Sequence, residues 1–288
     1  MNILITGSNG QLGLEIKDLS SDYSEYNFFF ENFKNLDITD IEKVKSYILN
    51  KKIQAVINCA AYTAVDKAEI EKEKAEKVNY IGVSNLIKAI GLVDGKLIHI
   101  STDYVFNGES VLPYKEEDNV NPINVYGKTK LKGETEILKS SVEAIIIRTS
   151  WLYSIYGNNF VKAMLRLGKE KKELNVVYDQ IGVPTYAKDL AKVCLDIVVR
   201  NEKIDKNSKI YHYSNEGVTS WYDFAKAIMK LSKIDCNIYP IETKQYPTPA
   251  KRPNFSLLNI SKIKEDFNIK IPYWRDSLKD CIDSIKNE

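Results

Sequence analysis

Histidine is scarce in this chain: His99 and His212 are the only two among 288 residues. The cysteines are four and stand far apart, with no CxxC pair: Cys59, Cys194, Cys236 and Cys281. These spacings exclude a zinc site of the usual ligand pattern, and scattered cysteines are typical of a reducing compartment. No apolar run approaches the ~18 residues that span a bilayer, and no basic leader precedes the first apolar segment. We therefore expect a cytoplasmic protein without a membrane partner.

Excess charge of either sign is also missing. The 41 basic and 39 acidic side chains leave a net charge of +2, which does not indicate a nucleic-acid partner. Hydrophobic residues make up 44% and charged residues 28%, which is typical of a folded globular chain rather than a disordered one. The length allows one large domain, or a large and a small one that share a core.

Apolar and helical patterns alternate through the first half of the chain. Strands are expected at 1–6, 27–30, 55–59, 96–101 and 144–148, and helices at 11–19, 40–50, 64–89 and 126–138. Such alternation predicts an α/β fold, a Rossmann-type doubly wound parallel sheet with helices on both faces.

The alternation of strands and helices weakens after about Trp151, where loops carry more proline and tyrosine. We expect a smaller α/β lobe here, formed by 151–186 and 214–288, while an apolar helix at 187–199 and a strand at 210–213 return to the sheet. The Rossmann-type domain then comprises 1–150 and 187–213. The helically spaced Trp221, Tyr222, Phe224 and Ala225, and also Trp274, are expected to pack inside the smaller lobe.

A glycine-rich turn joins the first strand to the first helix, with glycines at Gly7, Gly10 and Gly13. Glycine allows a tight turn and close approach of the backbone to a pyrophosphate, and the helix N-terminus offers N–H groups to the phosphates. This position in the chain predicts a dinucleotide site. At the end of the second strand Glu31 favours NADH, whereas Lys34 close behind leaves NADPH open.

Tyr126 and Lys130 stand four residues apart on an expected helix, so both side chains share one face. A nearby ammonium favours the phenolate and makes a tyrosine usable as an acid near neutral pH. Thr102, at the end of the fourth strand, supplies a hydroxyl that can hold a carbonyl oxygen. Together these residues predict a reductase with Tyr126 as the proton donor.

These features resemble the extended short-chain dehydrogenase/reductase superfamily and, more closely, the dTDP-4-dehydrorhamnose reductases. The matching stretches span almost the whole chain and lie at 58–69, 101–106, 125–131, 148–153, 159–160, 179–185 and 246–253. The resemblance implies reduction of the 4-keto group of dTDP-4-dehydro-β-L-rhamnose to dTDP-L-rhamnose. Hydride would come from NADPH or NADH and a proton from Tyr126.

The resemblance also implies roles for individual residues. The catalytic residues would be Tyr126, Lys130 and Thr102. The cofactor would contact Gly7, Gly10, Gln11, Leu12, Gly13, Glu31, Asp37, Ile38, Ala60, Ala61, Tyr62, Thr63, Tyr126 and Lys130. The nucleotide-sugar substrate would contact Thr102, Asp103, Tyr104, Trp151 and Arg252. Asp37 has a second interpretation as a cap near the next helix.

Some family members form dimers around a magnesium ion held by glutamates. Glu15 matches one such position, but Lys188-Asp189 stands near the second and the tail offers only Glu288. We therefore assign no metal site, expect Glu15 to be a solvated side chain, and leave Mg²⁺ and the choice between monomer and homodimer open.

Two other functions remain as alternatives. One is a non-catalytic NAD(P)-binding protein similar to the regulatory subunit of methionine adenosyltransferase, against which Asp103 and Trp151 argue. The other is a reductase or epimerase for another nucleotide-deoxysugar, since fold does not determine sugar stereochemistry.

Overall fold

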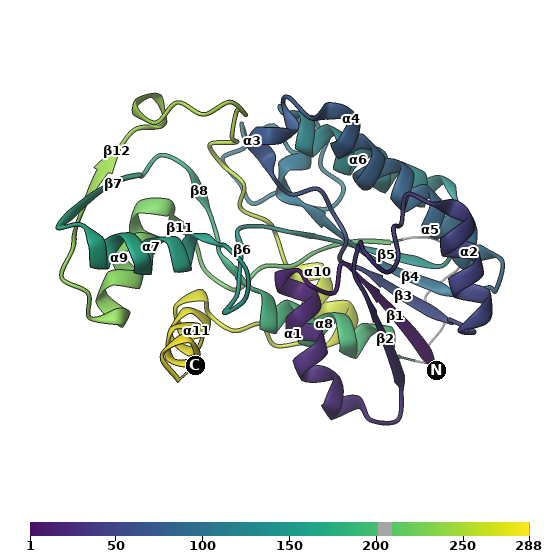
Figure 1. Cartoon of the computed structure of the whole chain (residues 1–288). Coiled ribbons are helices and arrows are strands. Elements are labelled where there is room, and N and C mark those ends of the chain that lie inside the picture. Colours follow the sequence, from purple (N-terminus) through teal and green to yellow (C-terminus); the bar gives the residue numbers. More distant parts are fainter. Residues whose placement is uncertain (201–208, 288) are drawn as a thin grey trace.

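A computed structural model describes residues 1–200 and 209–287. Its centre is a six-stranded parallel sheet (Figure 1). The strands in spatial order are β10 (Lys209–His212), β5 (Ala144–Thr149), β4 (Lys96–Thr102), β3 (Ala55–Asn58), β1 (Asn2–Thr6) and β2 (Asn27–Glu31). The predicted Rossmann-type sheet is confirmed, and so is the return of the later strand, which pairs with β5.

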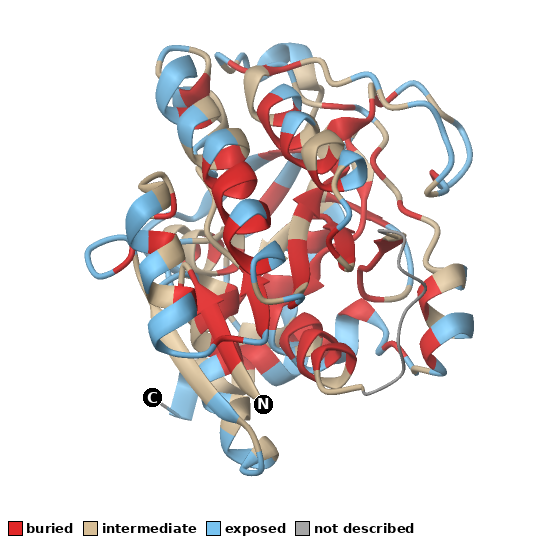
Figure 2. Ribbon diagram, turned by 90° about the vertical axis from the view of Figure 1, so that its right-hand side faces the viewer, coloured by how far each residue is buried: buried red, intermediate tan, exposed pale blue. Residues whose placement is uncertain are grey.

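Helices cover both faces of this sheet, as the apolar strands require. One face packs against α1 (Gln11–Leu19), α8 (Ala187–Val198) and α10 (Ser261–Phe267). The other packs against α2 (Ile41–Asn50), α5 (Gly82–Gly91) and α6 (Val125–Lys139). Alternation along β1 explains the division, because Ile3 and Ile5 face the first layer and Leu4 faces the second. Figure 2 shows the sheet as the buried centre of the molecule.

The continuous helix predicted at 64–89 is wrong. The segment forms α3 (Val65–Ala68), α4 (Lys72–Glu76), a π-helical turn η2 (Lys77–Ile81) and then α5. The break falls at Ile70, which is 84% exposed and therefore gains nothing from helical packing. By contrast, α2 begins as predicted, with the Asp40 carboxylate accepting a hydrogen bond from the Lys43 backbone N–H.

The rest of the chain builds a smaller lobe with its own apolar core. Its larger elements are α7 (Phe160–Glu170), β7 (Glu173–Val177), α9 (Trp221–Ser232), β12 (Asn237–Ile241) and α11 (Trp274–Asn287). Short strands form two further two-stranded sheets: β6 (Leu152–Tyr153) pairs with β9 (Thr185–Tyr186), and β8 (Ile181–Gly182) pairs with β11 (Thr219–Ser220). Phe224, Ala225 and Trp274 are buried there as predicted. None of the helices formed by the described residues has both the length and the apolar character needed to cross a membrane.

Candidate active site

The predicted site residues follow the carboxyl ends of the central strands, where doubly wound sheets bind ligands. β1 leads into the glycine turn, and β4 leads into a short 3₁₀ turn, η3 (Asp103–Val105). Helix α6 packs against η3 and carries Tyr126 and Lys130 to the same edge. The fold therefore brings the glycine turn and the Tyr-Lys pair together from opposite ends of the Rossmann-type domain.

The glycine turn is shaped for close backbone approach. Gly7 has φ of +65°, and a Cβ there would lie 2.6 Å from the Ala60 backbone nitrogen. The turn closes through the Gly10 N–H, which donates to the Gly7 carbonyl at 2.9 Å. Gly10 then caps α1 without any side-chain hydrogen bond. Gly7 is therefore required by close packing against the Ala60 backbone, and Gly10 leaves the N-terminus of α1 free of a side chain, so this end of the helix fits a dinucleotide phosphate.

The rest of the turn is fixed by its neighbours. Leu12 is buried in the sheet's core, and Gly13 lies so close to the Ser8 backbone that a Cβ would sit 2.6 Å from the Ser8 Cα. The Gln11 side-chain oxygen accepts a hydrogen bond from Asn159, 148 residues further along the chain. This bond connects the cofactor turn to the smaller lobe.

Glu31 ends β2 beside the end of β1, pairing in register with Thr6. Its Oε1 accepts a 2.7 Å hydrogen bond from the Tyr47 hydroxyl, while Oε2 is buried without a partner among the described residues. A free carboxylate oxygen at this point suits a ribose hydroxyl. Lys34 is exposed nearby, so the structure keeps both of the charges that were identified in the sequence.

Asp37 closes its own turn, because its carboxylate accepts a hydrogen bond from the Thr39 N–H at 2.9 Å. Ile38 is buried, and its carbonyl accepts from the Asn85 side chain on α5. The N-cap of α2 is Asp40, so the second interpretation of Asp37 as a helix cap is wrong, and Asp37 closes a local turn instead.

A residue that sequence reasoning missed holds the 60–63 loop. Asn79, on the π-helical turn, accepts from the Tyr62 N–H at 2.8 Å and donates to the Tyr62 carbonyl at 3.1 Å. It also donates to the Thr129 hydroxyl of α6 at 3.0 Å. One buried amide therefore ties the loop of Ala61 and Tyr62 to the helix that carries Tyr126, whereas Thr63 is exposed. The π-helical turn has no local sequence signal here, because the sequence predicted a continuous helix across this position.

Tyr126 lies in the first turn of α6. Asn124 caps this helix by accepting from the Gly127 N–H at 2.8 Å. Position 127 has no room for a side chain, because a Cβ there would clash with the Tyr104 carbonyl. Tyr126 therefore sits edge-on to the Tyr104 ring, with centroids 5.6 Å apart, and its hydroxyl lies near Thr102. Burial raises the pKa of Tyr126 to about 12, so the phenol is protonated at neutral pH.

Lys130 turns toward the sheet rather than toward Tyr126. Its Nζ donates to the Ile100 carbonyl at 2.6 Å and lies 3.2 Å from His99 Nε2. Burial lowers the pKa of Lys130 to about 8, although the negative charge of Glu134 acts to raise it. The sequence-based expectation that Lys130 depresses the pKa of Tyr126 is therefore not met in this arrangement.

Thr102 and Asp103 complete the catalytic edge. The Thr102 hydroxyl donates to Asp103 Oδ1 at 3.0 Å and accepts from the Tyr104 N–H at 3.2 Å. Asp103 is 1% exposed, and its Oδ2 makes no hydrogen bond of good geometry within the described residues, although Ser256 lies close. Burial raises the pKa of Asp103 to about 6. A buried oxygen that lacks a hydrogen bond is suited to accept one from a hydroxyl group of a bound sugar.

Trp151 stands where the chain leaves the sheet, with φ of +46°, a left-handed conformation that is strained for a bulky residue. Its ring stacks on Trp221, with centroids 3.7 Å apart and planes 14° apart. The sequence assigned Trp221 to packing alone and missed that it supports Trp151. Strain of this kind persists only where surrounding contacts hold it, and the Trp221 stack is one such contact.

Arg252 reaches across from the smaller lobe. Its guanidinium donates to both carboxylate oxygens of Asp66, at 3.0 and 2.8 Å, and Asp66 also accepts from the Ala250 N–H. The hydrogen bond with Arg252 holds the pKa of Asp66 below its usual value. Asp66 was not singled out from the sequence, yet it fixes the direction of the cation predicted to meet the diphosphate.

The comparisons with known proteins agree with this geometry. A family model described as the RmlD substrate binding domain matches residues 1–287. The chain belongs to this family. A dTDP-4-dehydrorhamnose reductase of Aggregatibacter actinomycetemcomitans is 44% identical over 286 residues, which cover 96% of this chain and 97% of that protein.

Two solved structures of the same name are also similar. The dTDP-4-dehydrorhamnose reductase of Clostridium acetobutylicum superposes with a TM-score of 0.94 at 43% identity, covering 99% of this chain and all of that one. The Bacillus anthracis enzyme, in complex with NADP, has a TM-score of 0.93 at 39% identity and covers 98% and 99% of the two chains. The predicted family is thereby confirmed.

In this RmlD-family chain, a buried ion pair fastens α6 to the sheet. Arg148 on β5 donates through Nε and Nη2 to Glu134 of α6, the shortest distance being 2.7 Å. Ser101 on β4 donates to the same carboxylate. Sequence reasoning missed this pair, because the only local signal is the spacing of Tyr126, Lys130 and Glu134 four residues apart.

Glu15 is not the solvated side chain that the sequence suggested. It is 2% exposed, because α1 packs on α8 and on the loop after β6, and it accepts a hydrogen bond from Ser154. Asp189 is engaged separately by Asn215 and Ser277. Over residues 1–200 and 209–287, no group of three His, Cys, Asp or Glu side chains could hold a metal ion. Glu288 lies outside the described residues.

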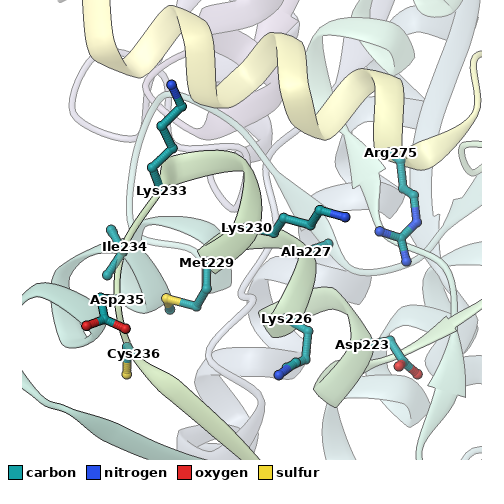
Figure 3. A pocket seen from close by; sticks show the side chains of 10 residues that line it. All are labelled: Asp223, Lys226, Ala227, Met229, Lys230, Lys233, Ile234, Asp235, Cys236 and Arg275. Atoms are coloured by element: carbon teal, nitrogen blue, oxygen red, sulfur yellow. The ribbon is translucent and has the colours of Figure 1, made fainter.

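An open hollow of about 580 Å³ lies elsewhere. It opens between α9 and α11 of the smaller lobe, where Lys226, Lys230 and Arg275 surround it (Figure 3). None of the predicted site residues lines it, and we do not assign the reaction to it.

Proposed function

We propose that this chain is an NAD(P)H-dependent oxidoreductase that reduces the 4-keto group of dTDP-4-dehydro-β-L-rhamnose to dTDP-L-rhamnose. The observation that carries the proposal is the position of Tyr126, whose phenol lies near Thr102 and edge-on to Tyr104 at the sheet edge that also holds the glycine turn. Relatives at 43% and 44% identity over nearly the whole chain bear the name of this reductase.

Residues of this chain supply the proton that the reduction requires. Tyr126, protonated at neutral pH, gives its proton to the alkoxide oxygen that forms at C4. Thr102 hydrogen-bonds the same oxygen, and Lys130 supplies positive charge where negative charge develops. The nicotinamide cofactor, when bound, supplies the hydride. Asp103 orients the sugar by accepting from one of its hydroxyls, and Trp151 packs on the ring.

The cofactor sites follow from the same edge. The backbone from Gly7 to Gly13 holds the pyrophosphate, the unpaired Glu31 oxygen meets the adenosine ribose, and the loop from Ala60 to Thr63 lines the nicotinamide. Glu31 supports use of NADH, while Lys34 and the NADP complex of the Bacillus anthracis relative support NADPH. We infer that both cofactors are accepted.

The same proposal covers organisation and location. Residues 1–150 with 187–213 form the cofactor domain, and 151–186 with 214–288 form the substrate lobe. We propose a cytoplasmic enzyme acting on a nucleotide sugar, as a monomer or a homodimer, without a nucleic-acid or membrane partner. Magnesium is not assigned a role.

The test is an assay of purified protein with dTDP-4-keto-L-rhamnose and either NADPH or NADH, following the nicotinamide absorbance. We expect stoichiometric cofactor oxidation and formation of dTDP-L-rhamnose. Cofactor binding without oxidation would reject the reductase in favour of a regulatory binding protein. Turnover only with another ketosugar would indicate a reductase of different substrate specificity in the same superfamily. Interconversion of sugars without net oxidation of the cofactor would indicate an epimerase.

Arg252→Gln is expected to raise KM for the nucleotide sugar about 10- to 100-fold, with a smaller change in kcat. A charge-assisted hydrogen bond to a diphosphate contributes equally to ground-state and transition-state binding, so its loss appears in KM. Steady-state kinetics at saturating cofactor measure both constants. Lys251→Gln removes a neighbouring exposed cation and is the matched control. Asp66→Asn removes the carboxylate that directs Arg252 while keeping the cation and should raise KM by no more than Arg252→Gln, and an unchanged KM in Arg252→Gln would contradict a direct role for Arg252.

A further inference from the structure

The chain segment that carries Arg252 crosses from the smaller lobe to the Rossmann-type domain. It passes beside α3 and then runs between the two lobes toward α10 (Figure 1). Farther along, it is fixed to β8, because the Ile181 N–H donates to the Asn254 carbonyl at 2.7 Å. Residues 250–252, which we call the Arg252 segment, have attachments of their own to the Rossmann-type domain. These attachments decide where the guanidinium lies.

The first attachment is Asp66 of α3, which fixes the direction of the guanidinium. Its carboxylate accepts from Arg252 Nη1 at 3.0 Å and Nη2 at 2.8 Å, and from the Ala250 N–H at 3.1 Å. The second N–H of Nη1 donates to the Ala250 carbonyl at 3.1 Å. Of the five N–H donors of a guanidinium, the one on Nε and one on Nη2 then have no partner among the described residues. Such a fork matches two oxygens of a phosphate.

The second attachment is Asn124, which is 2% exposed. Its Nδ2 donates to the Lys251 carbonyl at 2.9 Å, and its Oδ1 accepts from the Gly127 N–H at 2.8 Å. A backbone carbonyl only accepts and a backbone N–H only donates, so these two partners fix the orientation of the amide. One side chain therefore starts α6 and holds the Arg252 segment at the same time.

Both predicted site residues thus have a common anchor. Asn124 stands two residues before Tyr126, and the carbonyl that it holds belongs to the residue before Arg252. The start of α6 is held from α3 as well, because Glu69 at the end of α3 accepts from the Val125 N–H at 2.8 Å. The short helix that directs the guanidinium therefore also contacts the first turn of the helix that carries the phenol.

We infer that Asn124 is a positioning residue that holds the Arg252 segment against the start of α6. It thereby sets the separation between the cation for the substrate's diphosphate and the phenol of Tyr126. The inference rests on the proposed function. A nucleotide sugar must reach both groups at once, so its C4 oxygen meets the phenol only when the diphosphate is held at the matching distance.

A serine at position 124 separates this role from helix capping. Serine caps helices about as well as asparagine, so Asn124→Ser keeps an acceptor for the Gly127 N–H. Its shorter side chain does not reach the Lys251 carbonyl, which Asn124 contacts through its terminal nitrogen. Asn124→Ala removes both hydrogen bonds. Asp40→Ala removes the cap of α2 and is the control for the loss of a cap elsewhere in the same domain.

The first test measures tryptic cleavage of the full-length protein and needs no turnover. Lys251 is exposed, and trypsin cleaves after it when the segment opens locally. Loss of one hydrogen bond should raise the open fraction, so Asn124→Ser should be cleaved at this bond about 3- to 10-fold faster than the wild type. Mass spectrometry of the fragments gives the rate, which Asp40→Ala should leave unchanged. An unchanged rate in Asn124→Ser, or equal acceleration at every cleavage site, would overturn the inference whatever the substrate proves to be.

The second test uses steady-state kinetics with dTDP-4-keto-L-rhamnose. Asn124→Ser should raise KM for the nucleotide sugar about 3- to 10-fold, with KM for the nicotinamide cofactor and Tm close to those of the wild type. Asn124→Ala should show the same rise in KM and a Tm lower by about 2 °C. Asp40→Ala should reproduce the fall in Tm with an unchanged KM for the sugar. An unchanged KM in Asn124→Ser would leave only the capping role and would reject the inference.

A double variant tests whether Asn124 acts through the guanidinium. In the Arg252→Gln background, Asn124→Ser should raise KM no further, because the group that it positions is already gone. If the two increases multiply instead, Asn124 acts independently of Arg252 and the inference is rejected. Absence of turnover in the wild type would reject the proposed function, while the tryptic cleavage rates would still decide whether Asn124 holds the segment.

Discussion

Tyr126→Phe is expected to lower kcat about 10²- to 10⁴-fold while KM for both substrates changes little. The phenol lies beside Thr102 at the catalytic edge and burial keeps it protonated, whereas burial raises the pKa of the neighbouring Asp103 carboxyl only to about 6, so that group is largely ionised at neutral pH. Phenylalanine keeps the ring and its edge-on contact with Tyr104, so folding should be unaffected. Stopped assays of product formation, with unfolding temperatures of both proteins, measure the effect.

The matched control is Tyr239→Phe, which removes a hydroxyl from a tyrosine that is 48% exposed on β12. Its kcat should equal that of the wild type. Residual activity of Tyr126→Phe within a few-fold of the wild type would show that another group, with Asp103 the first candidate, delivers the proton.

The second large effect concerns stability. Arg148→Met should lower the free energy of unfolding by about 3–5 kcal/mol, because it leaves the Glu134 carboxylate buried without its cation. For a chain of this size that corresponds to a fall in Tm of roughly 10 °C. Catalytic activity should fall at temperatures well below the new Tm only if α6 shifts relative to β4. Calorimetry or denaturant unfolding gives the measurement.

Two further variants isolate the cause. Arg166→Met breaks the pair with Glu170 on α7, whose side chains are 64% and 52% exposed, and should cost under about 1 kcal/mol. Replacing both partners, as Arg148→Met with Glu134→Leu, should recover much of the lost stability, since no unpaired charge remains buried. If the double variant were no more stable than Arg148→Met, the loss would come from packing rather than from the unpaired carboxylate.

Local patterns determined a large part of this protein. The apolar strands, the helix that starts at Gln11, the helix that follows Asp40 and the four-residue spacing of Tyr126 and Lys130 depend on neighbours in the chain, and each is present as expected. Local periodicity also has limits. The sequence of the charged segment at 64–89 has a helical pattern throughout, but the structure interrupts the helix. The pattern does not reveal the interruption, because exposed Lys and Glu occur in helices and in turns alike.

The direction of Lys130 and the burial of Glu15 could not be predicted locally. Helical spacing placed Lys130 on the same face as Tyr126, but the acceptor that its Nζ reaches belongs to β4, 30 residues away. Glu15 has the surroundings of a surface glutamate in the sequence, and only the packing of α1 against α8 and the loop near Ser154 covers it.

By itself, then, the sequence determined most of the order of elements, the parallel sheet, the glycine turn, the helical position of Tyr126 and the family. The tertiary structure alone decided which charges and amides meet. Asp66 pairs with Arg252 across 186 residues, Asn124 meets Lys251 across 127, and Trp221 supports Trp151 from another element. The physical reason is range: helix and strand patterns depend on residues a few positions apart, whereas a hydrogen-bond direction or an ion pair depends on whichever side chain the fold brings within about 3 Å.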